Sequence, residues 1–319
     1  MEINNTVVFV SSRDLNRAEN IKALWSEYYG PKKFIQKYNN KYDELSEKRF
    51  RLVITDDFLP GCISPMIMIF HGIAGGKTYG LDSPSHYHRK ETARRYLYFI
   101  TSSKDMVEFT ANQCGAEKNK VLPLGMPRTD AYIGKKKGDG GTEWVDKKTY
   151  LYVPTFNTYT ESFTDWKAVD RMLSDDEILL IKNHPITGKT DLRGEFKHIY
   201  QIDPQKITTP YLIDCDVCIT DYSSTMFDAY VLKKPVVLYE KDWKTYKNTR
   251  GMYFDYPNEY SSRHANTGYE MLRLCREAVG NFKTDKICVK NREKLAGACD
   301  GNSTKRIIDL IEKELSNGE

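Results

Sequence analysis

Two histidines stand at the ends of apolar, strand-like runs, and their chemistry is the first clue to function. His71 directly follows the run 66–70, and His184 closes the run 178–181 with Lys182 beside it. A neutral imidazole with an ordinary pKa of about 6.5 can take a proton from a hydroxyl, and a lysine adds positive charge. Either histidine alone is as often an ordinary loop residue. One in each half of the chain favours proton transfer and charge stabilisation at a ligand site.

A polar turn with two serines is the second clue. The run 217–220 leads into Asp221 and Tyr222, then Ser223 and Ser224, and a helix is predicted over 225–232. Small hydroxyl residues at a helix start leave backbone N–H groups open to phosphate oxygens, and the helix dipole favours negative charge. The alternative is that the two serines only cap the helix, as most such pairs do.

Three further loop residues could contact phosphate. Lys77 ends a glycine-rich stretch after His71, and Arg128 offers a guanidinium that can bind phosphate through two hydrogen bonds. Thr155 follows the first strand of the second half. Each of these residues alone is more often part of an ordinary loop. Their occurrence together is what supports a phosphate site.

The elements that must position these residues alternate between strands and helices. Apolar, β-branched runs predict strands at 6–10, 51–55, 66–70, 97–101, 150–153, 178–181, 217–220 and 235–239. Amphipathic patterns predict helices at 15–25, 103–113, 225–232, 269–279 and 303–315. This alternation predicts α/β architecture with parallel sheets, whose ligands bind at the carboxyl ends of the strands.

The length of 319 residues fits two domains. The stretch Gly134–Thr142 is rich in glycine and lysine without periodicity, which predicts a linker between an N-terminal domain over 1–134 and a C-terminal domain over 143–319. The pair Cys215 and Cys218 lacks a second pair at similar spacing, so buried free thiols are favoured over a zinc site.

Composition narrows the classes of function. With 48 Lys plus Arg against 44 Asp plus Glu, the net charge is only +4, which does not indicate nucleic-acid binding. The run 66–70 is the longest apolar one, too short to span a bilayer, and the N-terminus lacks the pattern of a signal peptide. We therefore expect a cytoplasmic protein. Basic residues in 269–279 and 303–315 leave a peripheral contact with the inner face of the membrane open, although such residues more often face solvent.

Taken in order, these motifs resemble the CDP-glycerol glycerophosphotransferase family of teichoic-acid primases and polymerases. The resemblance covers roughly residues 66 to 315. Its matching features are His71-Gly72, Lys77, Gly80-Leu81-Asp82, Gly125-x-Pro127-Arg128-x-Asp130, Pro154-Thr155-Phe156, His184-Pro185, Thr220-Asp221-Tyr222-Ser223-Ser224, Phe227-Asp228, Lys234-Pro235, Arg250-Gly251-x-Tyr253 with Asp255, and Asp300-Gly301.

The resemblance implies a GT-B fold, with two Rossmann-like domains facing across a cleft, the second binding the nucleotide and the last helix packing back on the first. It implies transfer of a polyol phosphate, glycerol phosphate first of all, from a CDP-activated donor such as CDP-glycerol. The acceptor would be a hydroxyl of a lipid-linked or polymeric glycan in teichoic acid or capsule synthesis, and CMP would be released. No metal and no cofactor are implied, because CDP-polyol is a substrate.

Roles follow from the resemblance in the same way. His71 would deprotonate the acceptor hydroxyl, and His184 with Lys182 would stabilise charge on the pyrophosphate. Ser223 and Ser224 would hold that pyrophosphate, while Arg128, Lys77 and Thr155 are candidates for phosphate contacts.

One departure and two alternatives stay open. The usual His-Gly-Thr-Pro appears here as His71-Gly72-Ile73-Ala74, which leaves the acceptor side open. One alternative is a nucleotide-sugar glycosyltransferase of the same fold. The other is a non-catalytic relative that binds polymer, although retention of both histidines and the double serine argues against it.

Overall fold

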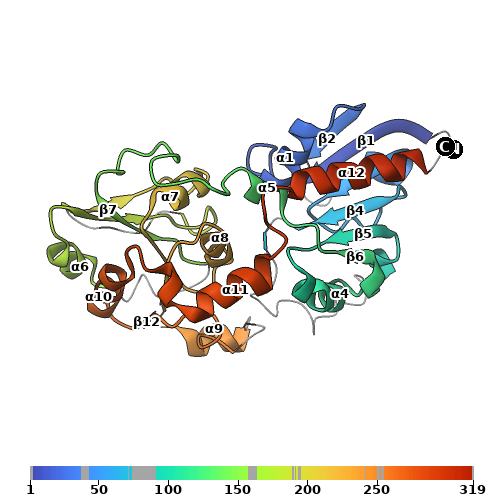
Figure 1. Ribbon diagram of the computed structural model, residues 1–319. Coiled ribbons are helices and arrows are strands. Elements are labelled where there is room, and N and C mark those ends of the chain that lie inside the picture. Colours follow the sequence, from blue (N-terminus) through green and yellow to red (C-terminus); the bar gives the residue numbers. More distant parts are fainter. Residues whose placement is uncertain are drawn as a thin grey trace. The chain divides into compact units, whose positions relative to one another are not determined.

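The structure is a computed structural model (Figure 1) that describes residues 3–36, 43–70, 72–73, 91–156, 164–188, 190, 192, 195–240, 242–249, 252 and 255–317. Among these residues the chain forms two compact units. The first unit combines residues up to Ile133 with those from Lys294 onward, and the second runs Gly134–Glu293. The expected second domain over 143–319 therefore differs from the second unit at its end, because the C-terminal residues belong to the first unit.

The first unit contains a parallel sheet of six strands in the order β2-β1-β3-β4-β5-β6. Its strands are β1 (Ile3–Ser11), β2 (Lys32–Gln36), β3 (Arg49–Thr55), β4 (Met66–Ile69), β5 (Tyr96–Ile100) and β6 (Val121–Leu122).

The second unit contains a parallel sheet of six strands in the order β12-β11-β10-β7-β8-β9. Its strands are β7 (Lys148–Tyr152), β8 (Glu177–Ile181), β9 (Ile199–Gln201), β10 (Val217–Thr220), β11 (Val236–Tyr239) and β12 (His264–Ala265).

Helices connect the strands in both units. They are α1 (Glu19–Glu27), α2 (Asp43–Glu47), η1 (Lys104–Met106), α4 (Val107–Cys114), η2 (Lys118–Lys120), α5 (Pro127–Asp130), α6 (Trp166–Met172), α7 (Thr209–Asp214), α8 (Thr225–Val231), α9 (Trp243–Thr249), α10 (Gly268–Ala278), η4 (Phe282–Thr284), α11 (Lys286–Ala296) and α12 (Ser303–Ser316).

The predicted α/β class with two Rossmann-like halves is confirmed, and each strand predicted from the sequence is present. The strands that no pattern predicted lie at or near sheet edges and are polar or short. β2 reads Lys-Lys-Phe-Ile-Gln and is only partly buried, while β6 and β12 are two residues long. An edge strand buries too little apolar surface to leave a clear alternation in the sequence.

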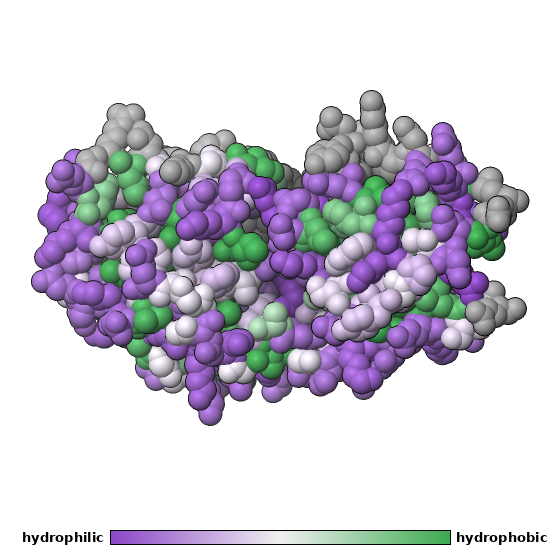
Figure 2. All heavy atoms as spheres, turned by 90° about the horizontal axis from the view of Figure 1, so that it is seen from above, coloured by the Kyte–Doolittle hydropathy of each residue, from purple (hydrophilic) through white to green (hydrophobic). Residues whose placement is uncertain are grey.

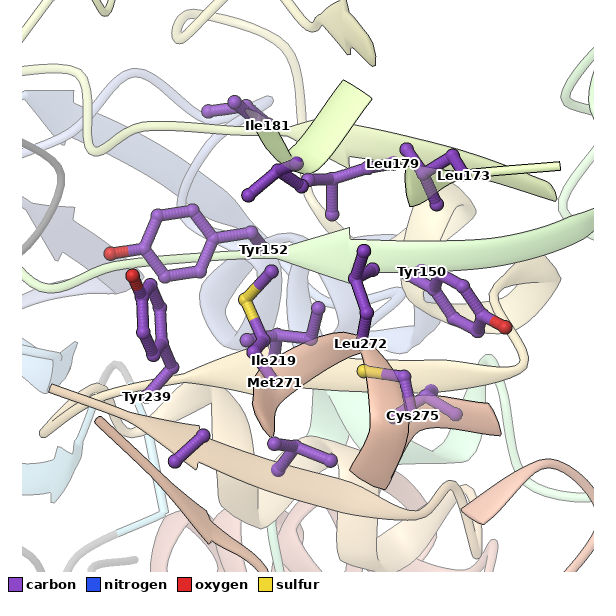
Figure 3. Packing of buried hydrophobic residues seen from close by; sticks show 14 of the residues in the cluster. Tyr150, Tyr152, Leu173, Leu179, Ile181, Ile219, Tyr239, Met271, Leu272 and Cys275 are labelled. Atoms are coloured by element: carbon purple, nitrogen blue, oxygen red, sulfur yellow. The ribbon is translucent and has the colours of Figure 1, made fainter. Parts of the chain in front are cut away.

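The core of the second unit forms where α10 packs on the sheet (Figure 3). Leu272 and Cys275 of this helix face Tyr150 of β7 and Ile219 of β10, and all four are at most 1% exposed. Helix α10 begins with a capping box, in which the Thr267 hydroxyl accepts from the Glu270 N–H and the Glu270 carboxylate accepts from the Thr267 N–H. Such a box satisfies backbone donors that the first turn would otherwise leave open.

The last helix, α12, packs on the first unit through Ile307 and Ile311, which join the buried cluster around β1 and α1. Its start is held by Asp130, whose carboxylate accepts from the Ser303 N–H at 3.2 Å and the Thr304 N–H at 2.6 Å. Gly125 has a φ of +91°, and a Cβ there would lie 2.4 Å from the Ala298 carbonyl oxygen. Two residues of the Gly125–Asp130 motif therefore dock the returning helix.

The stretch expected to be a linker, 134–142, is an ordered turn packed on the second unit. The Asp214 carboxylate accepts from the N–H groups of Gly138, Gly140 and Thr142 at 2.8 to 2.9 Å. A Cβ at Gly140 would lie 2.2 Å from the Pro210 carbonyl oxygen, so only glycine fits. The absence of periodicity in this stretch reflects a turn built by one buried carboxylate, at the point where the second unit begins.

The strand orders fix where ligand sites belong. In a doubly wound parallel sheet the direction in which successive strands are added reverses at one point. The connections of the two strands at this point run to opposite faces of the sheet, which leaves a crevice at the carboxyl ends of the strands. This point lies between β1 and β3 in the first sheet and between β7 and β10 in the second.

Hydrophilic residues cover most of the face seen in Figure 2, where hydrophobic residues gather in small, separate groups. Within the described ranges, no helix combines the length and the apolar character needed to cross a bilayer.

Candidate functional site

A buried carboxylate joins the two loops at the reversal point of the second sheet. Asp221, which follows β10, is 0% exposed and accepts hydrogen bonds from the Thr155 N–H at 2.8 and 3.1 Å. It also accepts from the Tyr222 N–H at 2.5 Å, while the Thr220 hydroxyl donates to the Val153 carbonyl at 2.6 Å. A buried charge needs such donors, because leaving water is costly. The loop after β7 and the turn after β10 are thereby fixed to one another.

The double serine lies on this turn, just before α8. Ser224 occupies the N-cap position, is exposed and makes no capping hydrogen bond through its side chain. The Ser223 hydroxyl donates to the Thr225 hydroxyl at 3.1 Å and accepts from the Thr225 N–H at 3.4 Å, which is a long contact. The serines therefore contribute little as caps, and both hydroxyls lie where a ligand at the carboxyl edge could meet them.

His184 lies at the same edge, in the loop after β8. Its Nδ1 accepts from the Ile186 N–H at 3.2 Å, and its ring lies 5.0 Å from the Phe156 ring between centroids. A nitrogen that accepts carries no proton, so the neutral ring carries its proton on Nε2. Phe156 follows Thr155 directly, and so the Asp221 bridge also positions the residue against which His184 packs.

Lys182 takes a different place from the one its sequence position suggested. Its side chain is buried, at 2% exposed, and its ammonium donates to the Pro204 carbonyl oxygen at 3.1 Å. This bond ties the loop after β8 to the segment after β9. Lys182 thus supplies positive charge from below the loop and holds the backbone that leads to His184.

An acidic and aromatic group beside this turn was missed by sequence reasoning. Glu240 and Asp242 follow β11, and the Tyr222 hydroxyl donates to Asp242 at 2.9 Å. The Tyr222 ring stacks on Tyr246 at 3.8 Å between centroids. Burial, together with the charges of Asp221 and Asp242, raises the pKa of Glu240 to about 7. The sequence signal was weak, since carboxylates dispersed over two loops form no motif.

A second cluster of polar and ionisable side chains lies at the reversal point of the first sheet. No sequence motif predicted it. The Ser11 hydroxyl, at the end of β1, donates to the Asp56 carboxylate, after β3, at 2.8 Å. Burial raises the pKa of Asp56 to about 6, although this hydrogen bond and the charge of Arg13 oppose the shift. Burial lowers the pKa of the Arg13 guanidinium, and the positive charge of Arg128 lowers it further. The negative charge of Asp56 has the opposite effect but does not cancel the shift.

Arg128, a candidate from the sequence, interacts electrostatically with Arg13 of this cluster. Its side chain is 13% exposed, and its guanidinium lies 3.8 Å from the Glu19 carboxylate. The backbone N–H of Arg128 donates to the Asn20 side-chain oxygen at 2.8 Å. The Asn20 amide in turn donates to the carbonyl of Phe70 at 2.7 Å. Arg128 is therefore connected to the end of the segment that precedes His71. His71 and Lys77 themselves lie outside the described residues.

The cysteines offer no ligand set. All seven are buried, and burial raises the pKa of the Cys215 thiol to about 12, so it stays protonated, whereas metal binding needs the thiolate. Across the part of the chain that the structure describes, no group of three His, Cys, Asp or Glu side chains has an arrangement that could hold a metal ion.

Comparison with known sequences connects these residues to a family. The family model described as CDP-Glycerol:Poly(glycerophosphate) glycerophosphotransferase matches residues 64–313. The teichoic acid glycerol-phosphate primase of Bacillus subtilis (strain 168) is 28% identical over 266 residues, which cover 78% of this chain and 68% of the primase. The teichoic acid poly(ribitol-phosphate) polymerase of Bacillus spizizenii is 25% identical, with 96% of this chain and 56% of the polymerase covered.

Comparison with solved structures bears on the fold. The wall teichoic acid polymerase TagF has a TM-score of 0.76 at 19% identity, and the match covers 98% of this chain and 89% of that one. The UDP-GlcNAc 2-epimerase of Methanocaldococcus jannaschii has a TM-score of 0.56 at 13% identity, with 97% of this chain and 99% of that one covered. These likenesses support the GT-B type of fold.

The raised pKa of Glu240 generates a prediction for stability. The folded-state pKa of about 7 lies above the ordinary 4.5, so between these pH values the folded state keeps a proton that the unfolded state loses. The free energy of unfolding should therefore fall as pH rises through this window, by at most about 1.4 kcal/mol per pH unit, and level off above it.

Urea unfolding of wild type, Glu240→Gln and the exposed control Glu195→Gln at pH 5 and pH 8 measures this slope. The Glu240→Gln variant should show a smaller fall than wild type, with the raised pKa of Asp56 still contributing, and the control should keep the full fall. Equal slopes in both variants would show that Glu240 is ionised throughout.

Proposed function

The chain belongs to the CDP-glycerol:poly(glycerophosphate) glycerophosphotransferase family, and from this we propose that it transfers a polyol phosphate from a CDP-activated donor to an acceptor hydroxyl. Enzymes of this family are polyol-phosphate transferases of teichoic acid synthesis. We take glycerol phosphate as the transferred group, because the family description and the B. subtilis primase both name it. The acceptor we propose is a hydroxyl of a lipid-linked or polymeric glycan chain.

In the proposed reaction the acceptor oxygen attacks the phosphorus that carries the polyol. A new P–O bond forms, the P–O bond to CMP breaks, and CMP leaves with the electron pair while the acceptor proton passes to a base. Phosphoryl transfer of this kind depends on positioning and on stabilising charge at the phosphate oxygens. Cationic side chains and N–H donors supply that charge here, so the proposal needs no metal ion.

The observation that carries the proposal is the convergence at the reversal point of the second sheet. Asp221 fixes the Thr155 loop to the serine turn, and Phe156 packs on His184, so hydroxyls and a ring N–H occupy one edge. We assign the donor pyrophosphate to this edge, against Ser223 and Ser224, with Thr155 nearby. The Nε2–H of His184 would donate to the oxygen on which charge develops as CMP leaves.

The remaining roles are assigned on charge and on sequence position. Lys182, buried below the loop, would act through its charge and by holding His184 in place rather than by touching phosphate. Arg128, beside Arg13 at the edge of the first sheet, would bind phosphate of the donor or the acceptor, and Lys77 would do the same. His71 would act as the base for the acceptor hydroxyl.

The direct test is CMP release. The purified protein should release CMP from CDP-glycerol in the presence of an acceptor and EDTA, and more slowly from CDP-ribitol. CMP release from CDP-ribitol but not from CDP-glycerol would show that ribitol phosphate is the transferred group. Complete loss with EDTA, restored by magnesium, would contradict the metal-free assignment, and release of sugar from a nucleotide sugar would favour a glycosyltransferase.

Enlarging the serine turn should weaken donor binding. The double variant Ser223→Leu/Ser224→Leu should bind CDP at least tenfold less tightly in calorimetry, because bulky side chains would displace the phosphates while the part-exposed positions tolerate them. Ser316→Leu, an exposed serine of α12, serves as the control and should bind CDP normally. Unchanged CDP affinity in the double variant would show that the phosphates of CDP do not bind at this turn.

The two histidines should separate by role. His71→Ala should slow transfer by about 10²–10⁴-fold with donor affinity nearly unchanged, because a general base acts on the acceptor. His184→Ala should lower turnover and also weaken CDP binding. The wild-type rate should fall below about pH 6.5 as His71 protonates, and this limb should vanish in His71→Ala. Full activity of His71→Ala would place the base elsewhere.

A further inference from the structure

The second unit contains a cavity of about 710 Å³ that shares no residue with the site at the carboxyl edge. One wall comes from residues 140–144, before β7, and the other from β9, the segment after it and the start of α7. Its volume falls in the range of small-molecule sites. Neither the transfer chemistry nor the motifs of the sequence use it.

Aromatic rings from both walls meet in this cavity. Trp144 lies 5.8 Å from Tyr200 and 6.3 Å from Tyr211 between ring centroids, with interplanar angles of 43° and 40°. Tyr200 is 41% exposed and Ile207 is 36% exposed, so both present apolar surface to the cavity that they line. The exposed ring of Tyr200, held beside Trp144, offers a stacking surface to a ligand.

Polar groups with capacity for hydrogen bonds line the same cavity. The Gln201 side-chain nitrogen is buried and has no hydrogen-bond partner among the described residues. Such an atom carries an energetic penalty unless a ligand or water satisfies it. The Asp203 carboxylate and the Lys206 ammonium also line the cavity, and they can accept from and donate to hydroxyl groups.

The charge of the lining selects the class of ligand. Glu143 and Asp203 are acidic and Lys206 is basic, so the charged lining residues sum to −1. A phosphate polymer or a nucleotide would meet net repulsion there. A neutral, hydroxyl-rich ring meets none, and it can stack its apolar face on an aromatic wall.

The wall opposite β9 is held in place before any ligand arrives. The carboxylate of Asp214 bonds the N–H groups of Gly138, Gly140 and Thr142, and Gly140 itself lines the cavity. A wall ordered in advance lowers the entropy that binding must overcome. The stretch that resembled a linker is thus part of a shaped pocket.

We propose that this cavity is a binding site for a neutral sugar residue. The sugar ring stacks on Tyr200 and Trp144, and its hydroxyls bond to the Gln201 amide and to Asp203 and Lys206. This function goes beyond the proposed transfer reaction and is argued from the cavity alone.

The test measures binding rather than turnover, so its outcome is independent of transfer activity. Saturation-transfer NMR on the full chain uses disaccharides of glucose, of galactose and of N-acetylglucosamine, with CMP and glycerol 3-phosphate as anionic probes. At least one disaccharide should bind at millimolar concentration or below. Tyr200→Ala should weaken it about tenfold, through loss of the stacking surface.

Two further variants complete the design. Gln201→Leu keeps the size of the side chain, removes its hydrogen bonds and should weaken the same sugar, while Tyr269→Ala removes a tyrosine that is 66% exposed on α10 and should leave binding unchanged. Thermal unfolding checks that the variants fold. Failure of every disaccharide to bind, equal binding by Tyr200→Ala and wild type, or preferential Tyr200-dependent binding of CMP or glycerol 3-phosphate would each overturn the proposal.

Discussion

The buried carboxylate of Asp221 is the interaction on which the candidate donor site depends. A charge that is fully removed from water has to be satisfied by donors, and here the donors are backbone N–H groups of Thr155 and Tyr222. Because these groups belong to loops after two different strands, satisfying one charge also fixes the separation of the loops. The packing of Phe156 on His184 extends the same constraint to a third loop. The buried charge of Asp221 also affects a neighbouring carboxyl group. It adds to the effect of burial in raising the pKa of Glu240.

The first unit solves a similar problem with different groups. At its reversal point the partners are the Ser11 hydroxyl and the Asp56 carboxylate, with Arg13 nearby. In both sheets the reversal of strand order opens a crevice at the carboxyl ends, and a carboxylate bonded across it defines the edge. The segment Gly125–Asp130 combines a candidate phosphate-binding residue with residues that have a structural role. Arg128 faces the ionisable cluster, while Gly125 and Asp130 of the same loop hold the returning helix α12.

A second carboxylate, Asp214, organises a region that the transfer reaction does not need. By bonding the N–H groups of a glycine-rich turn, it converts a stretch without regular structure into a fixed wall. The cavity beside that wall differs in character from the carboxyl edge. Aromatic rings and a negative balance of charge suit a neutral ligand, whereas hydroxyls and a ring N–H suit phosphate. If both proposals hold, the second unit binds an anionic and a neutral ligand at separate places, so the two ligands need not compete.

The sequence by itself determined the α/β class and the central strands, because buried parallel strands require continuous apolar runs. It also predicted a site at the carboxyl ends of the strands, because the loops that follow them carry the polar residues. It also proposed His184, the serine turn and Arg128 as site candidates, through residue type and position after a strand. Only the tertiary structure decided that Lys182 is buried against Pro204, that the charges of Asp56 and Arg13 interact, and that the stretch at 134–142, which begins the second unit, is held as a turn by Asp214. Each of these depends on contacts between segments far apart in the chain. Local periodicity records which side of an element is buried, but it carries no information about which distant carboxylate, carbonyl or ring lies opposite.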